Sequence, residues 1–161
     1  LSNLSDSGTL LSLILMLIGG SPGSTAGGLK TTTIAVVVIA VFAMAKGGDD
    51  INTFKRRIVS DVVKQSAVII LIYLFAVMLS SMIICSVEGL GMSQVLFETA
   101  SAAGTVGVSK GITNQISVIS KIILMIMMYG GRIGGLSLVL VFGQRKPEAP
   151  VKRPTEQILI G

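Results

Sequence analysis

The backbone of Gly104–Gly107, which follows the half-length apolar segment Met92–Ala103, is the part of this sequence best suited to binding a cation. A short helix aimed into a membrane, followed by a glycine-flanked strand, is a pattern that builds carbonyl rings for cations. Glycine permits angles that turn successive carbonyls to one side, and stiff Val106 supports an extended backbone. An ordinary surface loop after an interfacial helix is the alternative. The residues predicted to supply carbonyls are Gly104, Thr105, Val106 and Gly107.

A second glycine-rich stretch, residues 19–28, interrupts an apolar region near the start of the chain. The apolar runs on its two sides, Leu10–Ile18 and Ile34–Ala45, are each shorter than the roughly 20 residues that a spanning helix needs. Together they are long enough if the stretch lies at membrane depth, against protein or a water-filled cavity. We therefore expect residues 1–45 to form a broken transmembrane helix with a movable barrier in it. The glycines of this barrier are Gly19, Gly20, Gly23, Gly27 and Gly28.

Arg132 places a charge inside the last strong apolar run, Ile116–Phe142. Placing such a charge at the centre of a spanning helix raises the free energy of membrane insertion by at least ~2.5–3.5 kcal/mol. Arg132 lies about 15 Å of helix before Phe142, which is too deep for easy escape to water, so we expect a buried partner. The carbonyls of residues 19–28 have no helical partners, and arginine has five donors. Arg132 is therefore predicted to hold this loop closed, whereas the glycines of Gly130–Gly135 are expected to form a packing seam.

Three further features have simpler interpretations. Gly23–Thr31 nearly fits the phosphate-binding G-x-x-x-x-G-K-[ST] loop, but Leu29 is one residue too many before the lysine, and no βαβ pattern surrounds it. A glycine-rich hinge is the better interpretation; an ATP-driven enzyme subunit would require this phosphate loop to be real. Glu98 lies about two turns before Gly104, and we interpret it as a hydrogen-bonded structural carboxylate rather than an ion ligand. The methionines at 125, 127 and 128 are interpreted as adaptable packing.

The composition is that of a membrane protein. Hydrophobic residues make up 51% and charged residues 13%, with a mean hydropathy of +0.83, whereas soluble domains carry about 25% charged residues. The clearest spanning helix is Ala67–Val87, which contains no charge. The chain has no histidine and a single cysteine, Cys85, so it cannot build an internal disulfide and lacks the commonest general base and metal ligand. We predict no enzyme activity, no catalytic residues, no cofactor and no resident metal.

The charge distribution predicts a topology. The net charge of +5 is gathered in short basic clusters between apolar runs, which favours an anionic membrane face over nucleic acid as partner. Because cytoplasmic loops carry excess Lys and Arg, loop 46–65 and tail 144–161 are expected in the cytoplasm. Residues 66–143 then form one helix–pore-loop–helix unit whose middle part, Met92–Ser109, enters and leaves on the outer side. The basic residues concerned are Lys46, Lys55, Arg56, Arg57, Lys64, Arg145, Lys146, Lys152 and Arg153.

Five stretches, in order along nearly the whole chain, resemble the Trk/Ktr family of potassium transporters. Phe97–Ser109, with its Gly-Thr-Val-Gly, resembles the fourth pore-loop of that family. Gly19–Thr33 resembles its glycine-rich intramembrane loop in the third repeat, and Gly130–Gly134 resembles the arginine site of its final helix. Phe54–Ile58 and the terminal Ile158–Gly161 are similar to the KtrB-like branch.

The resemblance implies an all-α membrane protein of four helix–pore-loop–helix repeats around one path, each repeat supplying a quarter of the filter. This chain would be a C-terminal fragment of the ion-translocating subunit, with the last helix of the third repeat and the whole fourth repeat. The expected function is multi-pass potassium transport in the plasma membrane, with Na⁺ also possible as cargo, and the alternative is a non-conducting scaffold subunit. A homodimer and a cytoplasmic nucleotide-binding regulatory ring are the implied partners. The residues expected to contact the ring, or else anionic lipid, are Lys55, Arg56 and Arg57.

Overall fold

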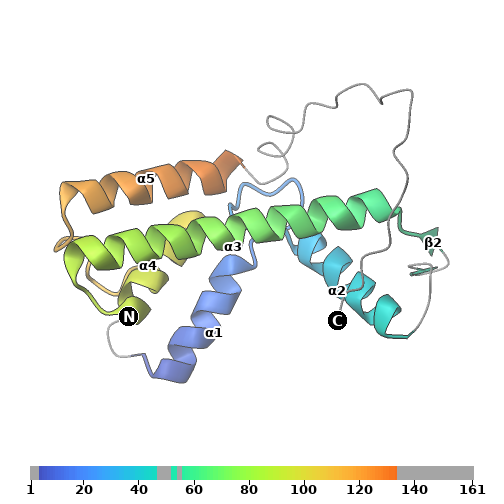
Figure 1. The fold of residues 1–161 in the computed structure, drawn as a ribbon, viewed down its shortest axis with the longest axis horizontal. Helices are drawn as coiled ribbons and strands as arrows, with labels where there is room; N and C mark the ends of the chain where they lie inside the picture. The colour runs from blue at the N-terminus through green and yellow to red at the C-terminus, as the bar shows by residue number, and fades with distance from the viewer. Residues whose placement is uncertain (1–3, 47–51, 54–55, 134–161) are drawn as a thin grey trace, which may run out of the picture.

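The computed structural model describes residues 4–46, 52–53 and 56–133, and these residues form helices joined by short connections, with one small hairpin (Figure 1). The all-α class predicted from the sequence is therefore confirmed apart from this hairpin, in which Asn52 pairs with Arg57 and Thr53 with Arg56. Tail 144–161 and residues 134–143 of the predicted last span lie outside the described residues. The elements are α1 Asp6–Leu17, α2 Thr31–Ala45, β1 Asn52–Thr53, β2 Arg56–Arg57, α3 Ser60–Glu88, α4 Met92–Ala103 and α5 Val118–Ile133.

Helix α3 is the long axis on which α2, α4 and α5 pack (Figure 1). It has 29 residues, about 43 Å of helix, which exceeds the roughly 30 Å hydrocarbon core of a bilayer. Within the described part of the chain it is the one helix long and apolar enough to cross a membrane. It begins seven residues before the predicted Ala67, because Asp61 suits the first turn of a helix, and it ends at Gly89 with a left-handed φ of 64°. Residues 60–65, assigned to the preceding loop, are thus helical.

The break predicted in the first apolar region is confirmed. Helix α1 ends at Leu17 and α2 begins at Thr31, and Ile18 and Leu29 form a parallel bridge that closes the base of the intervening loop. Two backbone hydrogen bonds complete this closure, Gly19 N–H to Leu29 O at 2.6 Å and Thr31 N–H to Gly20 O at 3.3 Å. Helix α1 packs against α4, while α2 packs against α3 (Figure 1). We call residues 18–30 the glycine loop.

Helix α4 is the buried centre of the fold. Its bounds are those predicted from the sequence, and at 12 residues it is about 18 Å long, roughly half of a membrane span. It contacts α1, α3 and α5. Ser81 and Thr99 share a 2.6 Å hydrogen bond between their hydroxyls, which lets α3 and α4 approach closely. Five α4 side chains are at most 1% exposed, namely Val95, Phe97, Thr99, Ala100 and Ala103.

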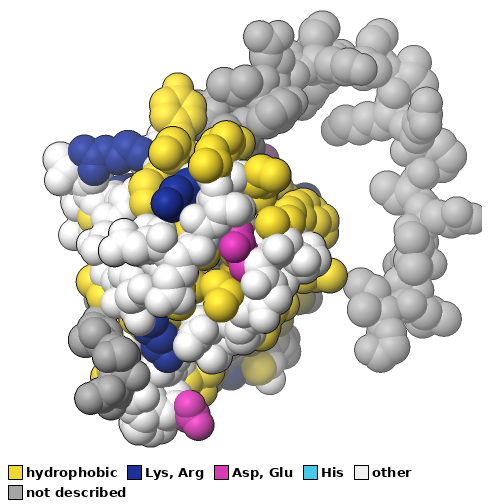
Figure 2. Space-filling view, turned by 90° about the vertical axis from the view of Figure 1, so that its left-hand side faces the viewer, with side chains coloured by type: hydrophobic (Ala, Val, Ile, Leu, Met, Phe, Trp, Pro, Cys, Tyr) yellow, Lys and Arg dark blue, Asp and Glu magenta, His cyan; other side chains and the backbone are white. Residues whose placement is uncertain are grey.

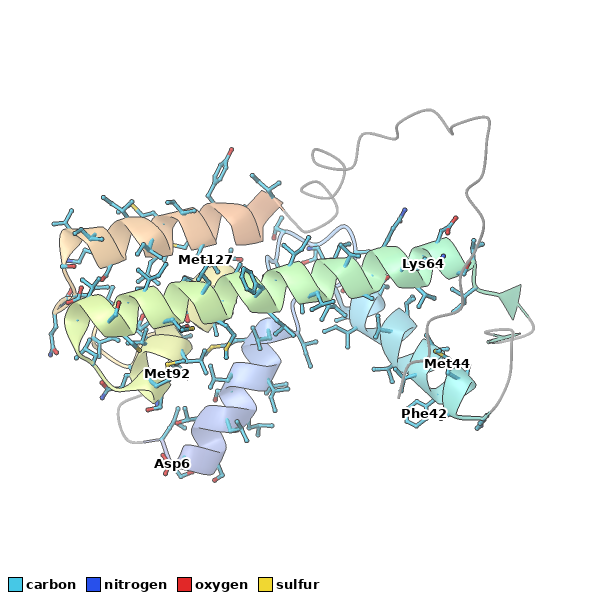
Figure 3. The ribbon with its side chains drawn as sticks, viewed as in Figure 1. Asp6, Phe42, Met44, Lys64, Met92 and Met127 are labelled. Atoms are coloured by element: carbon cyan, nitrogen blue, oxygen red, sulfur yellow. The ribbon has the colours of Figure 1, made fainter. Side chains whose placement is uncertain are left out.

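Helix α5 returns along α3 and continues through Gly130 and Gly131 to Ile133. Glu88 fixes the start of α5, because its Oε1 accepts hydrogen bonds from the Ser117 N–H and from the hydroxyls of Ser117 and Ser120. Of the three methionines, Met127 packs against the core between α5 and α3 (Figure 3). Met125 and Met128 are exposed.

The outer faces of the helices carry large apolar side chains. Leu71 and Phe75 on α3 and Ile126 on α5 are all at least 65% exposed. Figure 2 shows the end where α3 meets α5, and uncharged groups cover most of that face, with few charged side chains. Because soluble monomers rarely expose continuous apolar patches of this kind, these faces are suited to contact with lipid or with other protein.

Candidate ion-binding site

The backbone of Gly104–Gly107 turns rather than running straight from α4. Gly104 has helical angles, φ −71° and ψ −9°, and caps α4. Thr105 has a φ of 52° and Gly107 a φ of 79°, both in the left-handed region. The predicted extended strand is therefore wrong for Gly104 and Thr105; segment 106–110 has no regular secondary structure. Left-handed angles are unfavourable for a β-branched residue, so other contacts must hold Thr105 in place.

Three of the four N–H groups of this segment are bound, whereas its carbonyls accept no hydrogen bond from described residues. Gly104 N–H donates to Ala100 O at 2.8 Å and Thr105 N–H donates to Ala102 O at 3.1 Å. Val106 N–H donates to Ser101 O at 2.9 Å. Within the described ranges of the chain, no hydrogen bond is accepted by the carbonyl oxygens of residues 104–107. The segment thus presents mainly hydrogen-bond acceptors, as a cation site requires. We call residues 104–107 the carbonyl segment.

Helix ends add a favourable electrostatic environment. Gly104 follows the last residue of α4, and it also lies against Met16 in the last turn of α1, because a β-carbon on Gly104 would be 2.5 Å from Met16 O. The C-terminal end of a helix carries a partial negative charge. Two such ends therefore meet beside the carbonyl segment, and both favour a cation there.

The glycine loop packs directly against the carbonyl segment. Gly27 N–H donates to Thr105 Oγ1 at 2.9 Å, and a β-carbon on Gly27 would lie only 2.4 Å from that oxygen. Gly28, with φ +77°, lies beside Gly104. Gly131 completes the contact from α5, since its β-carbon would lie 1.9 Å from Ala103 O. Gly131 therefore belongs to the predicted packing seam. Gly130 does not, because nothing lies within 4 Å of a β-carbon on it.

The other glycines of the loop differ in their surroundings. A β-carbon on Gly19 would be 2.2 Å from Gly27 O, and one on Gly20 would be 2.7 Å from Ser24 Oγ. Gly23 lies in the exposed turn with φ +81°, and its β-carbon would meet nothing within 4 Å. Close approach thus explains Gly19 and Gly20, while backbone conformation explains Gly23.

Two cationic side chains bind the carbonyls of the loop. Arg132 donates from Nη1 to Thr25 O, so the structure joins the arginine and the loop that the sequence paired. Arg132 is exposed in the described chain, however, so the expectation of a buried partner is wrong: Thr25 lies on the exposed turn. Lys30 Nζ donates to Ala26 O at 2.6 Å and to Ser24 O at 3.3 Å. Sequence reasoning missed Lys30, which it weighed only as a phosphate-binding lysine.

The geometry of the glycine loop disfavours phosphate binding. A phosphate loop surrounds its ligand with backbone N–H groups. Here Lys30 instead binds the loop's own carbonyls, and Gly27 N–H is bonded to Thr105 Oγ1. The interpretation of the loop as a glycine-rich hinge is the one that these contacts favour.

The remaining predicted residues lie apart from the carbonyl segment or outside the description. Arg56 and Arg57 form β2, before the start of α3, and Lys55 lies outside the described residues. Glu98 is 7% exposed and accepts hydrogen bonds from the Ser109 and Thr113 hydroxyls, so its prediction as a hydrogen-bonded carboxylate is confirmed. Arg56 and Arg57 remain predicted partner-binding residues.

Comparison with known proteins identifies the family of this chain. Residues 1–152 match the family model of TrkH, described as a cation transport protein. The chain is 37% identical to the Ktr system potassium uptake protein D of Bacillus subtilis over 161 residues, all of this chain and 36% of that protein. It is 36% identical over 169 residues to the potassium/sodium uptake protein NtpJ of Enterococcus hirae, covering 98% of this chain and 36% of that protein. Ktr system potassium uptake protein B of Bacillus subtilis is 32% identical over 155 residues, 96% of this chain and 35% of that protein.

The chain thus spans about a third of the length of these curated relatives. The family match, in contrast, covers nearly the whole chain, including the glycine loop, the carbonyl segment and Arg132. The relatives are named as potassium or potassium/sodium uptake proteins. On these grounds the chain belongs to the TrkH family of cation transport proteins, which are membrane proteins.

Proposed function

We propose that this chain contributes one quarter of a potassium-selective filter and the barrier below it. The observation that carries the proposal is the asymmetry of the carbonyl segment. The N–H groups of Gly104, Thr105 and Val106 are bound to α4, while the carbonyls of residues 104–107 accept no hydrogen bond from described residues. Potassium loses its hydration shell in a filter and needs oxygen ligands in its place. The ligands proposed here are the carbonyl oxygens of Gly104, Thr105, Val106 and Gly107.

The glycine loop is the proposed movable barrier. Its carbonyls are held by Arg132 and Lys30, and its Gly27 N–H is held by Thr105. While the loop is in this position, two positive side chains lie beside the path and repel K⁺. Opening requires the loop to leave both cations, and its glycines permit the necessary backbone angles.

The proposal places the chain in the plasma membrane as the end of a four-repeat transporter. Loop 46–65 and the tail lie in the cytoplasm, and α4 with the carbonyl segment forms a re-entrant pore-loop on the outer side. The basic clusters support this topology, as does the half-span length of α4. A homodimer and a cytoplasmic nucleotide-binding ring are the proposed partners, since two of the relatives are named as Ktr system proteins. Arg56 and Arg57 are the proposed contacts to that ring.

The test is ion uptake by the full-length transporter in a potassium-uptake-deficient cell. Gly107 has φ +79°, so a side chain there strains the backbone although nothing within 4 Å would clash with it. Gly107→Ser should therefore leave insertion intact and lower the preference for K⁺ over Na⁺, measured as inhibition of Rb⁺ uptake by each ion. A parent transporter that moves no Rb⁺ would favour the non-conducting scaffold. Unchanged preference in Gly107→Ser would remove this residue from the filter.

A further inference from the structure

Glu98 is a buried carboxylate next to the outer end of the carbonyl segment. It lies on α4 and is 7% exposed. Its Oε1 accepts hydrogen bonds from the Ser109 hydroxyl and, at 3.1 Å, from Lys110 N–H. Its Oε2 accepts one from Thr113 Oγ1 at 3.2 Å. One side chain therefore binds three residues of the segment that follows residues 104–107.

These contacts extend a regular series of hydrogen bonds. Val106 N–H donates to Ser101 O at 2.9 Å, and Val108 N–H donates to Ser101 Oγ at 2.9 Å. Lys110 N–H then donates to Glu98. Because Glu98 and Ser101 are three residues apart, they share one face of α4. Every second N–H from 106 to 110 is thus fixed to that face, and Glu98 forms its outermost point.

The charge of Glu98 is satisfied by neutral donors. The three partners can all donate, which suits an ionised carboxylate, an acceptor-only group. Lys110 Nζ donates to Thr9 Oγ1 at 2.9 Å and lies 5.3 Å from the centre of the Phe97 ring. Within the described ranges, no cationic side chain forms an ion pair with Glu98.

We propose that Glu98 is a positioning residue that sets the selectivity of the carbonyl segment, an inference that rests on the proposed function. A smaller cation such as Na⁺ is well coordinated only if the carbonyls move inward. Glu98 opposes that movement, because it fixes residues 109–113 to a helix buried on three sides. Hydrogen bonds to a charged group are stronger than neutral ones, which makes this attachment stiff.

A purely structural role for Glu98 is the rival explanation, and Glu88 provides a matched control. Glu88 also accepts three hydrogen bonds, from Ser117 N–H at 2.9 Å and from the hydroxyls of Ser117 and Ser120. It joins α3 to the start of α5, outside the series that holds residues 106–110. Loss of either carboxylate should weaken the fold, but only loss of Glu98 should affect ion preference.

The experiment compares Glu98→Gln with Glu88→Gln in the full-length transporter. Glutamine keeps the shape but loses one acceptor oxygen and the charge. Both variants should lower the melting temperature, whereas Glu98→Gln alone should lower the K⁺ over Na⁺ preference in Rb⁺ uptake, by on the order of tenfold. The variants Ser109→Ala and Thr113→Val keep the carboxylate but remove one of its donors. Each should lower the K⁺ over Na⁺ preference by a smaller factor. Hydrogen exchange at residues 106–110 in the purified protein should also speed up in Glu98→Gln.

The outcomes separate this inference from the proposed function. Normal uptake with unchanged ion preference in Glu98→Gln would overturn the positioning role alone. An equal loss of preference in Glu88→Gln would also overturn it, because general destabilisation would then explain both. A parent protein without any Rb⁺ uptake would overturn the proposed function, and the selectivity role with it. If Glu98→Gln fails to insert, the Ser109→Ala and Thr113→Val variants test the positioning role instead. An unchanged K⁺ over Na⁺ preference in both variants would contradict the proposal.

Discussion

The carbonyl segment and the glycine loop are both irregular backbone between helices, yet their carbonyls have different surroundings. In the carbonyl segment and the residues after it, α4 binds the N–H groups of residues 104–106 and 108, and the carbonyls of residues 104–107 stay free of described donors. In the glycine loop, Arg132 and Lys30 bind the carbonyls at the exposed turn. Glycine content alone does not distinguish the two, since both contain glycines with positive φ.

The difference separates a rigid region from a movable one. The series of hydrogen bonds around the carbonyl segment ends in buried groups of one helix, so displacing it would disrupt the core. The turn of the glycine loop, residues 21–26, is exposed and depends on side-chain contacts. Hydrogen bonds at an exposed position can be exchanged for water at low cost. The first arrangement is suited to ion selection, and the second to opening and closing.

The largest expected effect comes from the glycine that joins the two regions. In Gly131→Ala the new β-carbon would be 1.9 Å from Ala103 O, so α5 must move away from α4. We expect a loss of about 1–3 kcal/mol or more, or no folded protein. Gly130→Ala is the control, because nothing lies near its β-carbon and alanine favours a helix by about 0.5–1 kcal/mol. Equal melting temperatures for the two purified variants would contradict this close contact.

The second effect concerns the cations that hold the glycine loop. Arg132→Ala removes the donor to Thr25 O, and Lys30→Met removes the donor to Ala26 O and Ser24 O. Each change should favour the open loop, so the maximal rate of Rb⁺ uptake should rise, on the order of tenfold for Arg132→Ala and less for Lys30→Met. Deletion of residues 24–26, which removes all three bound carbonyls, should raise it in the same way.

These three variants could insert normally and still take up Rb⁺ at the parent rate. That result would show that the barrier lies elsewhere in the protein. Lys64→Met is a suitable control, because Lys64 lies near the start of α3, away from the loop (Figure 3). Its uptake rate should equal that of the parent.

The smallest effect should come from Thr105, which links the two regions. Thr105→Val keeps the shape but leaves Gly27 N–H without its acceptor, and we expect a loss of about 1 kcal/mol in stability. Thr105→Ser keeps the acceptor and removes the methyl group that disfavours a φ of 52°. Serine should therefore match or exceed the parent in melting temperature. A serine variant as unstable as the valine variant would show that the hydroxyl contact is unimportant.

Much of the fold could be predicted from local sequence. The break at the glycine loop follows from Gly19–Gly28, and the bounds of α4 follow from Gly91 and Gly104, because these residues stop helices by their own backbone preferences. The pairing of Arg132 with the loop was predictable because a charge in an apolar run needs acceptors.

Two of the features that could not be predicted depend on contact between distant parts of the chain. The left-handed φ of Thr105 contradicts its local preference, and its hydroxyl contact is to Gly27, 78 residues away. The same is true of Gly131, whose neighbour Gly130 has identical chemistry and no close contact. Lys30 was missed because its role depends on how the loop folds back on itself.

The central claim is that the free carbonyls of residues 104–107 bind the transported ion, and heavy-atom labelling tests it most directly. Thallium(I) substitutes for K⁺ and scatters anomalously, so crystals of the full-length transporter grown in thallium salts would reveal its position. We predict an anomalous peak within coordination distance of the carbonyl oxygens of Gly104, Thr105, Val106 or Gly107, which weakens when K⁺ is added in excess. Ordered carbonyl oxygens with no thallium beside them, and a peak elsewhere in the path, would contradict the account.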